Sequence, residues 1–357
     1  MEYNWINNVA KLSDDQTSIT FNDEINEIIK PNTLPNTLTT LIFGKEFNQS
    51  LISNSLPENL TDLTFGEKFN QLIIPNSLPE NLTDLTFGAN FNQPIIPNSL
   101  PENLSFLTFG YDFNQKIEPN ILPKNLSILI FSDCFNQKIE PNSLPELLIT
   151  LIFGCNFNQK IEPNSLPESL ISLNFGYYFN QKIEPNVLPV LITTLFFGND
   201  FNQKIEPNIL PVSIRYLIFG NNFNQKIEPN SLPDSIKNIT FGCIFNQNID
   251  LNVLPSNLKY VEFNWIQIYK NKHSSSYIKM VNNIPGYYDV KIFLSYNILG
   301  DNGPKWPIHV LHYDETHWSS EIYEVIDNYK HPIYGDITVL VNKKTYQPYS
   351  SAKSALK

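Results

Sequence analysis

The sequence has few cysteines, few charged residues and no long apolar run, and each scarcity excludes a class of protein. Three cysteines in 357 residues are too few and odd in number for a disulfide framework, and they fit a reducing compartment. No run approaches the roughly 18 apolar residues of a membrane span. Charged residues make up 17% of the chain against 41% hydrophobic, which excludes a disordered polymer. We therefore expect a folded chain without disulfides.

Basic residues are also scarce, and Arg215 is the sole arginine of the chain. Lysine and arginine together number 24 against 35 acidic residues, a formal charge of −11. Such a chain is a poor partner for nucleic acid or for an anionic membrane surface. The N-terminus carries Asp14 and Asp15 where a secretory signal would have its apolar region. We therefore expect a soluble cytoplasmic protein that binds neither nucleic acid nor membrane.

A repeat of 22 residues organises most of the chain. The tripeptide Phe-Asn-Gln recurs ten times at this spacing without an insertion, which indicates an array of structural units. Degenerate copies at Phe21 and Phe263 extend the pattern, so that eleven to twelve coils fill about residues 12–268. The ten copies begin at Phe47, Phe69, Phe91, Phe113, Phe135, Phe157, Phe179, Phe201, Phe223 and Phe245.

Each unit predicts one short strand within a coil. In Leu85-Thr86-Phe87 the alternation places Leu and Phe on one face and Thr on the other. Two prolines in each unit, such as Pro79 and Pro97, exclude a long helix from the remainder. The fold class predicted is therefore a repeat solenoid, mainly β, in which parallel strands stack and six apolar side chains of each unit fill the interior.

Two columns of the repeat, one of glycine and one of asparagine, are expected to determine the conformation and hydrogen bonding of the backbone. The glycine after each strand becomes Asn22 and Asn264 at the ends of the array, which predicts a left-handed turn, since Asn tolerates positive φ best among the other residues. Ser132 replaces this glycine in mid-array and marks a candidate irregularity. The Asn of Phe-Asn-Gln is expected to bond turn backbone in the next coil.

The segments FNQKIEPNSLP and LPENLTDLTFG resemble FNIP repeats, a family known from social amoebae and from giant viruses that infect amoebae. FNIP units are themselves similar to leucine-rich repeats, so the resemblance implies a leucine-rich-repeat-like coil, and host cytoplasm if the protein is viral. The position of the conserved Asn in leucine-rich repeats is variable here, as at Asn90, which leaves the curvature open. Family members often carry an F-box, but residues 1–20 are too short and too polar for one.

The sequence divides into four predicted segments. Residues 1–20 form an N-terminal cap, residues 21–268 the repeat solenoid, residues 269–276 a linker, and residues 277–357 a small α+β C-terminal domain or cap. An array needs a cover because its last coil exposes apolar core.

The residues that flank the buried Leu of each strand point outward and form two columns. Thr and Ile would suffice for an exposed sheet without a partner, but two groups of larger apolar residues exceed that need and predict a protein-binding face. The first group is Phe106, Ile128, Ile130 and Ile152, and the second is Phe196, Tyr216 and Ile218.

Six consecutive units contain Lys-Ile-Glu-Pro, beginning at Lys116, Lys138, Lys160, Lys182, Lys204 and Lys226. Exposed ion pairs contribute only about 0–1 kcal/mol each. We interpret these rows as a solvated flank, with a charge-striped recognition surface as the alternative.

The C-terminal segment predicts strands at 288–296 and 337–341, and a helix after Ser320 in which Ile322, Val325, Ile326 and Tyr329 share a face. His309, His312 and His317 beside Asp314 and Glu315 suggest a metal site, but an extended strand would direct His309 and His312 to opposite faces. No phosphate loop, nucleophile elbow or HExxH motif is found. The sequence therefore predicts no metal, no cofactor and no catalytic site.

The leading hypothesis is a non-enzymatic interaction scaffold that binds a protein through the exposed strand face, and a substrate-recruiting adaptor is one form of this hypothesis. Two alternatives stay open at this point. One is a structural protein that arose by repeat expansion and has no dedicated partner, and the other is an enzyme housed in residues 277–357.

Overall fold

The computed structural model describes residues 9–242, 244–245, 247, 253–258, 260–264, 291–295, 307–313, 318–331 and 335–342. The chain divides into two compact units, Met1–Gln203 and Lys204–Lys357. Each unit is described by itself below.

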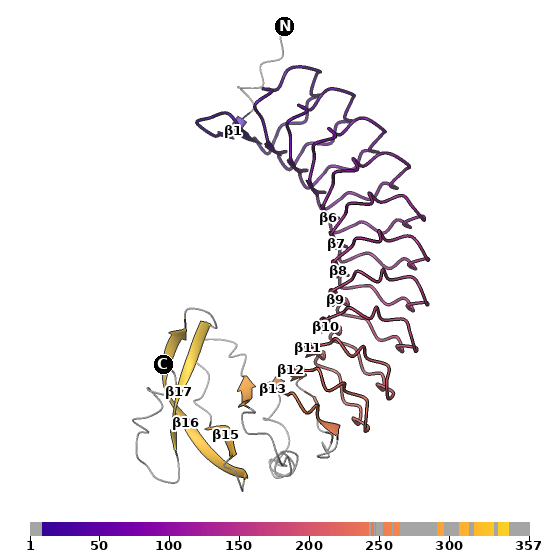
Figure 1. The fold of residues 1–357 in the computed structure, drawn as a ribbon. Helices are drawn as coiled ribbons and strands as arrows, with labels where there is room; N and C mark the ends of the chain where they lie inside the picture. The colour runs from indigo at the N-terminus through magenta and orange to yellow at the C-terminus, as the bar shows by residue number, and fades with distance from the viewer. Residues whose placement is uncertain are drawn as a thin grey trace. The chain divides into compact units, whose positions relative to one another are not determined.

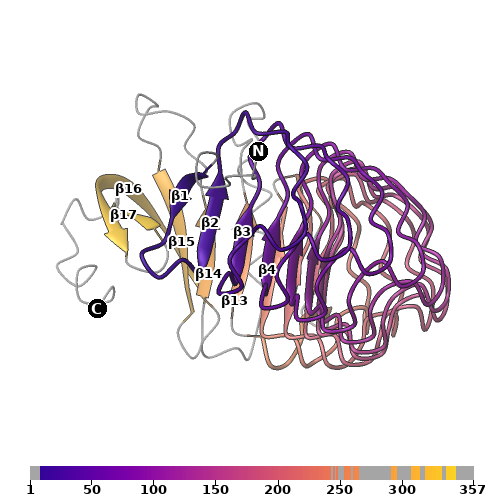
Figure 2. The ribbon, with the colours of Figure 1, turned by 90° about the horizontal axis from the view of Figure 1, so that it is seen from above.

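The first unit is a stack of coils, each of which contributes one short strand (Figure 1). Its strands β2 to β10 are parallel neighbours, and Figure 2 shows β2, β3 and β4 side by side. Strand β1 (Val9–Leu12) pairs antiparallel with β2 (Ser18–Phe21) and so begins the sheet with a hairpin. The later strands are β3 (Thr40–Ile42), β4 (Asp62–Thr64), β5 (Asp84–Thr86), β6 (Phe106–Thr108), β7 (Ile128–Ile130), β8 (Thr150–Ile152), β9 (Ser172–Asn174) and β10 (Thr194–Phe196).

The sequence repeat determines the register of this sheet. From β2 to β10, each strand residue pairs with the residue 22 positions away in the neighbouring strand, as in Thr40 with Asp62 and Phe106 with Ile128. Within the first unit the strands lie on the inner side of the curved stack, and the remainder of each coil spreads outward (Figure 1). The predicted parallel-strand solenoid is confirmed.

The second unit continues the repeat and then departs from it. Strands β11 (Tyr216–Ile218), β12 (Asn238–Phe241), β13 (Tyr260–Asn264) and β14 (Lys291–Ser295) pair in parallel order. A separate antiparallel sheet consists of β15 (Pro307–Tyr313), β16 (Trp318–His331) and β17 (Gly335–Asn342).

The helix predicted after Ser320 is wrong, because these residues belong to strand β16. Trp, Ile, Tyr and Val occupy six of its 14 positions, and such side chains favour strands. Pairing with β15 on one edge and β17 on the other satisfies the β16 backbone, so the helical spacing of its apolar residues does not decide the outcome. The strands predicted near Ile292 and at 337–341 are present as β14 and β17. The linker predicted at 269–276 lies outside the described residues, and the domain boundaries stay a prediction.

Six apolar side chains fill each coil, as predicted. In the coil of β5 they are at most 6% exposed. Two phenylalanines of one coil stack against each other, with 3.8 Å between the ring centroids of Phe87 and Phe91, and each stacks on its equivalent in the next coil. The interior is thus two continuous columns of aromatic rings beside aliphatic columns. The six residues of this coil are Leu78, Leu82, Leu85, Phe87, Phe91 and Ile95.

The Asn of Phe-Asn-Gln links successive coils, which confirms the predicted ladder. The side-chain oxygen Oδ1 of Asn70 accepts hydrogen bonds from the backbone N–H of Asn92 at 3.0 Å and from Nε2 of Gln93 at 3.1 Å. The same pair of bonds recurs from Asn26 onward through Asn180. The backbone N–H of each such Asn lies outside the strands and has no partner in the sheet. The side chain of the preceding coil supplies its acceptor.

The sequence predicts that the glycine column is required for a left-handed turn, but the structure shows a different reason. Eight glycines of this column, including Gly66 and Gly88, do not have positive φ, and a Cβ built on Gly88 would lie 1.7 Å from the carbonyl oxygen of Gly66. Glycine is required because the backbones of successive coils approach closely. The left-handed residue is instead the Asn that follows the proline, such as Asn98 with φ 60°. The buried hydroxyl of Ser132 donates to the carbonyl oxygen of Phe113 at 2.9 Å.

Candidate protein-binding face

The strand face presents the two predicted outward columns. In β6, β7 and β8 the central leucines Leu107, Leu129 and Leu151 are fully buried, while the residues on either side are half-buried. The alternation of a strand therefore separates core from surface as the sequence predicts.

The first predicted group lies together on adjacent strands. Phe106 is paired in register with Ile128 in the first column, and Ile130 with Ile152 in the second. All four side chains are half-buried. They form a continuous apolar area across β6, β7 and β8, in columns where β4 and β5 have Asp and Thr. We call these four residues the strand-face patch.

The second predicted group is divided between the two units. Phe196 ends β10 in the first unit and is half-buried, whereas Tyr216 and Ile218 belong to β11 in the second. Tyr216 is exposed and Ile218 is half-buried. Their action as one patch stays a prediction.

Four exposed apolar residues escaped the sequence prediction because they precede the strands. Leu147 and Ile149 lie three residues and one residue before β8, Ile171 lies one before β9, and Leu191 lies three before β10. Their exposed fractions are 58%, 43%, 41% and 54% in that order. A comparison of equivalent repeat positions outside the strand would have found them, because the earlier coils have Asn or Thr and Ser there. We call these four residues the pre-strand edge.

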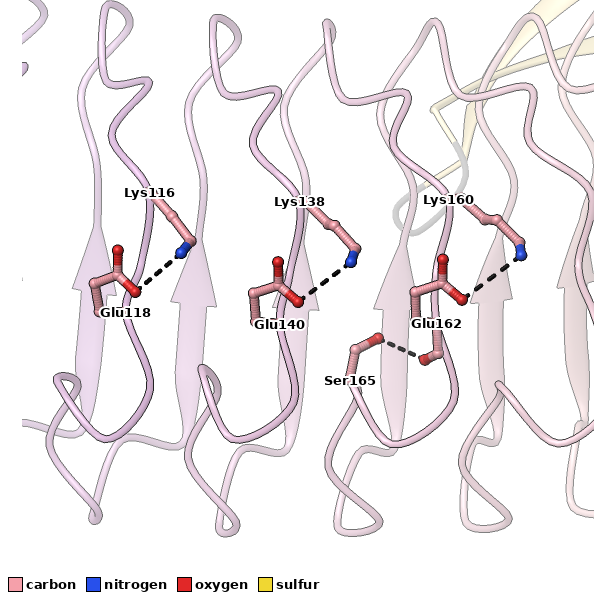
Figure 3. A network of polar contacts seen from close by, with 7 residues as sticks. All are labelled: Lys116, Glu118, Lys138, Glu140, Lys160, Glu162 and Ser165. Carbon is pink, nitrogen blue, oxygen red and sulfur yellow. Dashed lines mark hydrogen bonds and ion pairs between the residues drawn. The ribbon is translucent and has the colours of Figure 1, made fainter.

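The opposite side of the coil carries the Lys-Glu rows (Figure 3). Lys116 Nζ lies 3.0 Å from Glu118 Oε2, and Lys138 Nζ lies 3.3 Å from Glu140 Oε2. Every Lys-Ile-Glu segment forms the same pair within its own coil. These side chains are largely exposed, so each pair stabilises the fold only slightly.

One polar cavity of about 320 Å³ lies between two N-terminal coils. Asn32, Asn54 and Asn59 line it together with Ser55 and Glu58. The buried hydroxyl of Ser55 has no hydrogen-bond partner. With Glu58 as the one ionisable residue of its lining, the cavity lacks the paired acid and base that enzymatic sites commonly use.

The described cysteines are not activated nucleophiles. A hydrogen bond from the thiol to Asp133, together with burial, raises the pKa of Cys155. Burial, with the charges of Asp112 and Asp133, raises the pKa of Cys134. A thiol acts as a nucleophile through its thiolate, so both environments disfavour reaction. Cys243 lies outside the described residues.

The described residues contain no cluster of His, Cys, Asp and Glu that could hold a metal ion. His309 and His312 lie on strand β15, paired with Ile322 and Ser319, whereas Asp314, Glu315 and His317 lie outside the described residues. No helix in the described part has the length and hydropathy needed to cross a bilayer.

Comparison with known proteins agrees with this architecture. The FNIP Repeat family model matches residues 12–46, 47–88, 69–112, 113–156, 157–200 and 201–244. The chain is also similar to a solved structure from a giant virus, described as CroV588, a novel circular LRR protein, with 48% identity and a TM-score of 0.61. That match covers 68% of this chain but 39% of the other chain. A search of curated proteins found no match.

The fold is therefore a leucine-rich-repeat-like scaffold, and solenoids of this kind commonly bind proteins along an extended surface rather than catalyse reactions. The family model covers well over half of the sequence, in the same 22-residue units that the strands follow. The chain belongs to the FNIP repeat family.

Proposed function

We propose that this chain is a non-enzymatic scaffold that binds a protein partner through its exposed strand face, with Phe106, Ile128, Ile130 and Ile152 as the central contacts and Phe196, Tyr216 and Ile218 as further contacts. One observation supports this most: the strand-face patch places four large apolar side chains in register on three adjacent strands, where Thr would serve a solvated sheet equally well. Contiguous apolar surface of this kind is typical of interaction sites.

The distribution of charge supports the same face. The four patch residues carry no charge, whereas the opposite side of the same coils is occupied by paired lysines and glutamates. Apolar anchors commonly dominate the free energy of protein association, and rim charges chiefly change its rate and salt dependence.

A pull-down from the cell that produces the protein tests the proposal. Phe106→Ala with Ile130→Ala should remove the bound partners, because truncating an anchor commonly costs about 2 kcal/mol or more. Lys160→Ala with Glu162→Ala, on the opposite side of the coil, is the matched control and should retain them. Both variants must first melt like the wild type. Loss of partners by the control variant alone would place recognition on the Lys-Glu rows and contradict the proposal.

A further inference from the structure

At the pre-strand edge, two rows of side-chain hydrogen bonds between successive coils are interrupted. Three residues before the strand, Asn103 and Asn125 donate from Nδ2 to the carbonyl oxygen of the preceding coil at 2.8 and 2.9 Å. One residue before the strand, Ser105 and Ser127 donate from Oγ to the preceding coil at 3.2 and 3.0 Å. Both rows are regular through the coils of β4 to β7.

Exposed apolar groups interrupt both rows in the coil of β8, the Thr or Ser row in the coil of β9, and the Asn row in the coil of β10. Leu147 and Leu191 replace Asn, and Ile149 and Ile171 replace Thr or Ser, so the donors are lost at each position. None of the four side chains gains burial in return, because each is more than 40% exposed. The four apolar residues therefore do not stabilise the fold, and a role in binding would explain their presence.

The pre-strand edge adjoins the strands that carry the strand-face patch. Ile149 immediately precedes Thr150, which is paired in register with Ile128 of the patch. The backbone N–H of Ile171 donates to the carbonyl oxygen of Ile149 at 2.9 Å, so the two isoleucines lie in successive coils. Apolar residues of the pre-strand turns thus lie beside the strands of the patch, with Thr150 between Ile149 and Ile128.

The charges around this surface are predominantly negative. In the coils of β3 to β10, seven carboxylates lie four residues before a strand or at its first residue, and the same columns contain one lysine, Lys124. Within the described residues none of the seven forms an ion pair, whereas the glutamates of the Lys-Ile-Glu rows are all paired. The seven are Glu58, Asp62, Glu80, Asp84, Glu102, Glu146 and Glu168.

We infer that the pre-strand edge binds a cationic amphipathic segment of the protein partner, one whose apolar side chains alternate with Lys or Arg. Its apolar side chains contact Leu147, Ile149, Ile171 and Leu191, and its basic groups face the unpaired carboxylates, chiefly Glu146 and Glu168. The inference rests on the proposed function and specifies the chemistry of its partner. Unpaired charges of one sign beside an apolar surface select a partner of the opposite sign.

The variant that tests the inference replaces the four apolar residues by the residues found at the same positions of earlier coils. Leu147→Asn, Ile149→Thr, Ile171→Thr and Leu191→Asn together introduce the residues that the earlier coils have, and they change no charge. The probe is a labelled 18-residue amphipathic peptide of Leu and Lys, with a peptide of Leu and Glu in the same order as its counterpart. Binding to the full chain is measured by fluorescence anisotropy at two salt concentrations.

We expect the Leu-Lys peptide to bind the wild type and the Leu-Glu peptide not to bind. The fourfold variant should melt at or above the wild-type temperature and bind the Leu-Lys peptide at least about tenfold more weakly. Glu146→Gln with Glu168→Gln should weaken binding and reduce its salt dependence, whereas Glu140→Gln with Glu162→Gln, on the opposite side, should change neither.

Two outcomes would overturn the inference: equal binding of the two peptides, or wild-type affinity in the fourfold variant. The proposed function is tested separately by the Phe106 and Ile130 variant. If the Leu-Lys peptide fails to bind but captured partners still depend on Phe106 and Ile130, the partner chemistry is wrong and the strand-face proposal stands. If captured partners depend on neither surface, both are wrong.

Discussion

The phenylalanine of Phe-Asn-Gln contributes most to the core at the residue scale. Phe157 is fully buried and stacks 3.7 Å from Phe153 between ring centroids, with Phe135 and Phe179 above and below. Phe157→Ala would remove contacts in three coils at once, so we expect a loss of about 3–5 kcal/mol in the free energy of unfolding.

Thr150 is the matched surface control for that substitution. It is half-buried on the outward face of β8, and Thr150→Ala should cost less than about 1 kcal/mol. Urea unfolding of both variants gives the comparison. Equal losses would show that the inward and outward faces of the coil are wrongly assigned.

Gly88 distinguishes two explanations of the glycine column. Because a Cβ there would lie 1.7 Å from the carbonyl oxygen of Gly66, Gly88→Ala should cost about 1–3 kcal/mol through overpacking. Gly88→Asn should be at least as destabilising as Gly88→Ala. A left-handed turn would instead make Asn the milder replacement, so a thermal melt in which the Asn variant is the more stable would contradict the close-contact explanation.

At this scale the sequence shows which positions require glycine, but it does not show the physical reason for that requirement. A glycine column is compatible with positive φ or with close approach, and a single sequence does not separate them, because close approach depends on how neighbouring coils stack. The buried and exposed columns were predictable because strand alternation alone determines them.

The Asn ladder is the element that links one coil to the next. Asn70→Ala would leave the backbone N–H of Asn92 and the amide of Gln93 without their acceptor, and we expect a cost of about 1–2 kcal/mol. Hydrogen exchange should also be faster at the Asn92 amide. Asn90→Ala, an exposed position in the same coil, is the control. Unchanged exchange at Asn92 would mean that the ladder does not protect this amide.

Elements outside the repeat were harder to predict. In the array, ten copies of one pattern fix the strand and its register, since each copy repeats the same pairing. The segment that became β16 has both a helical spacing of apolar residues and a high content of strand-forming side chains, and its pairing with β15 and β17 decides between them. Pairing of this kind depends on residues distant in sequence.

At the scale of the whole molecule, the two sides of the coil differ in their chemistry. The strand side of the first unit carries the apolar strand-face patch and the pre-strand edge beside unpaired carboxylates, while the opposite side carries the paired Lys-Glu rows (Figure 3). The sequence predicted the strand-face residues but missed Leu147, Ile149, Ile171 and Leu191, because only the strand columns were compared between coils. Exposure at a turn depends on the path of the chain, which alternation does not describe.

The most direct test of the central claim is a hydroxyl-radical footprint of the chain with and without its captured partner. We expect the bound partner to reduce labelling of Phe106, Ile128, Ile130 and Ile152, while the side chains of the Lys-Glu rows are labelled as in the free chain. Protection of the Lys-Glu rows with unchanged labelling of the four strand-face residues would contradict it.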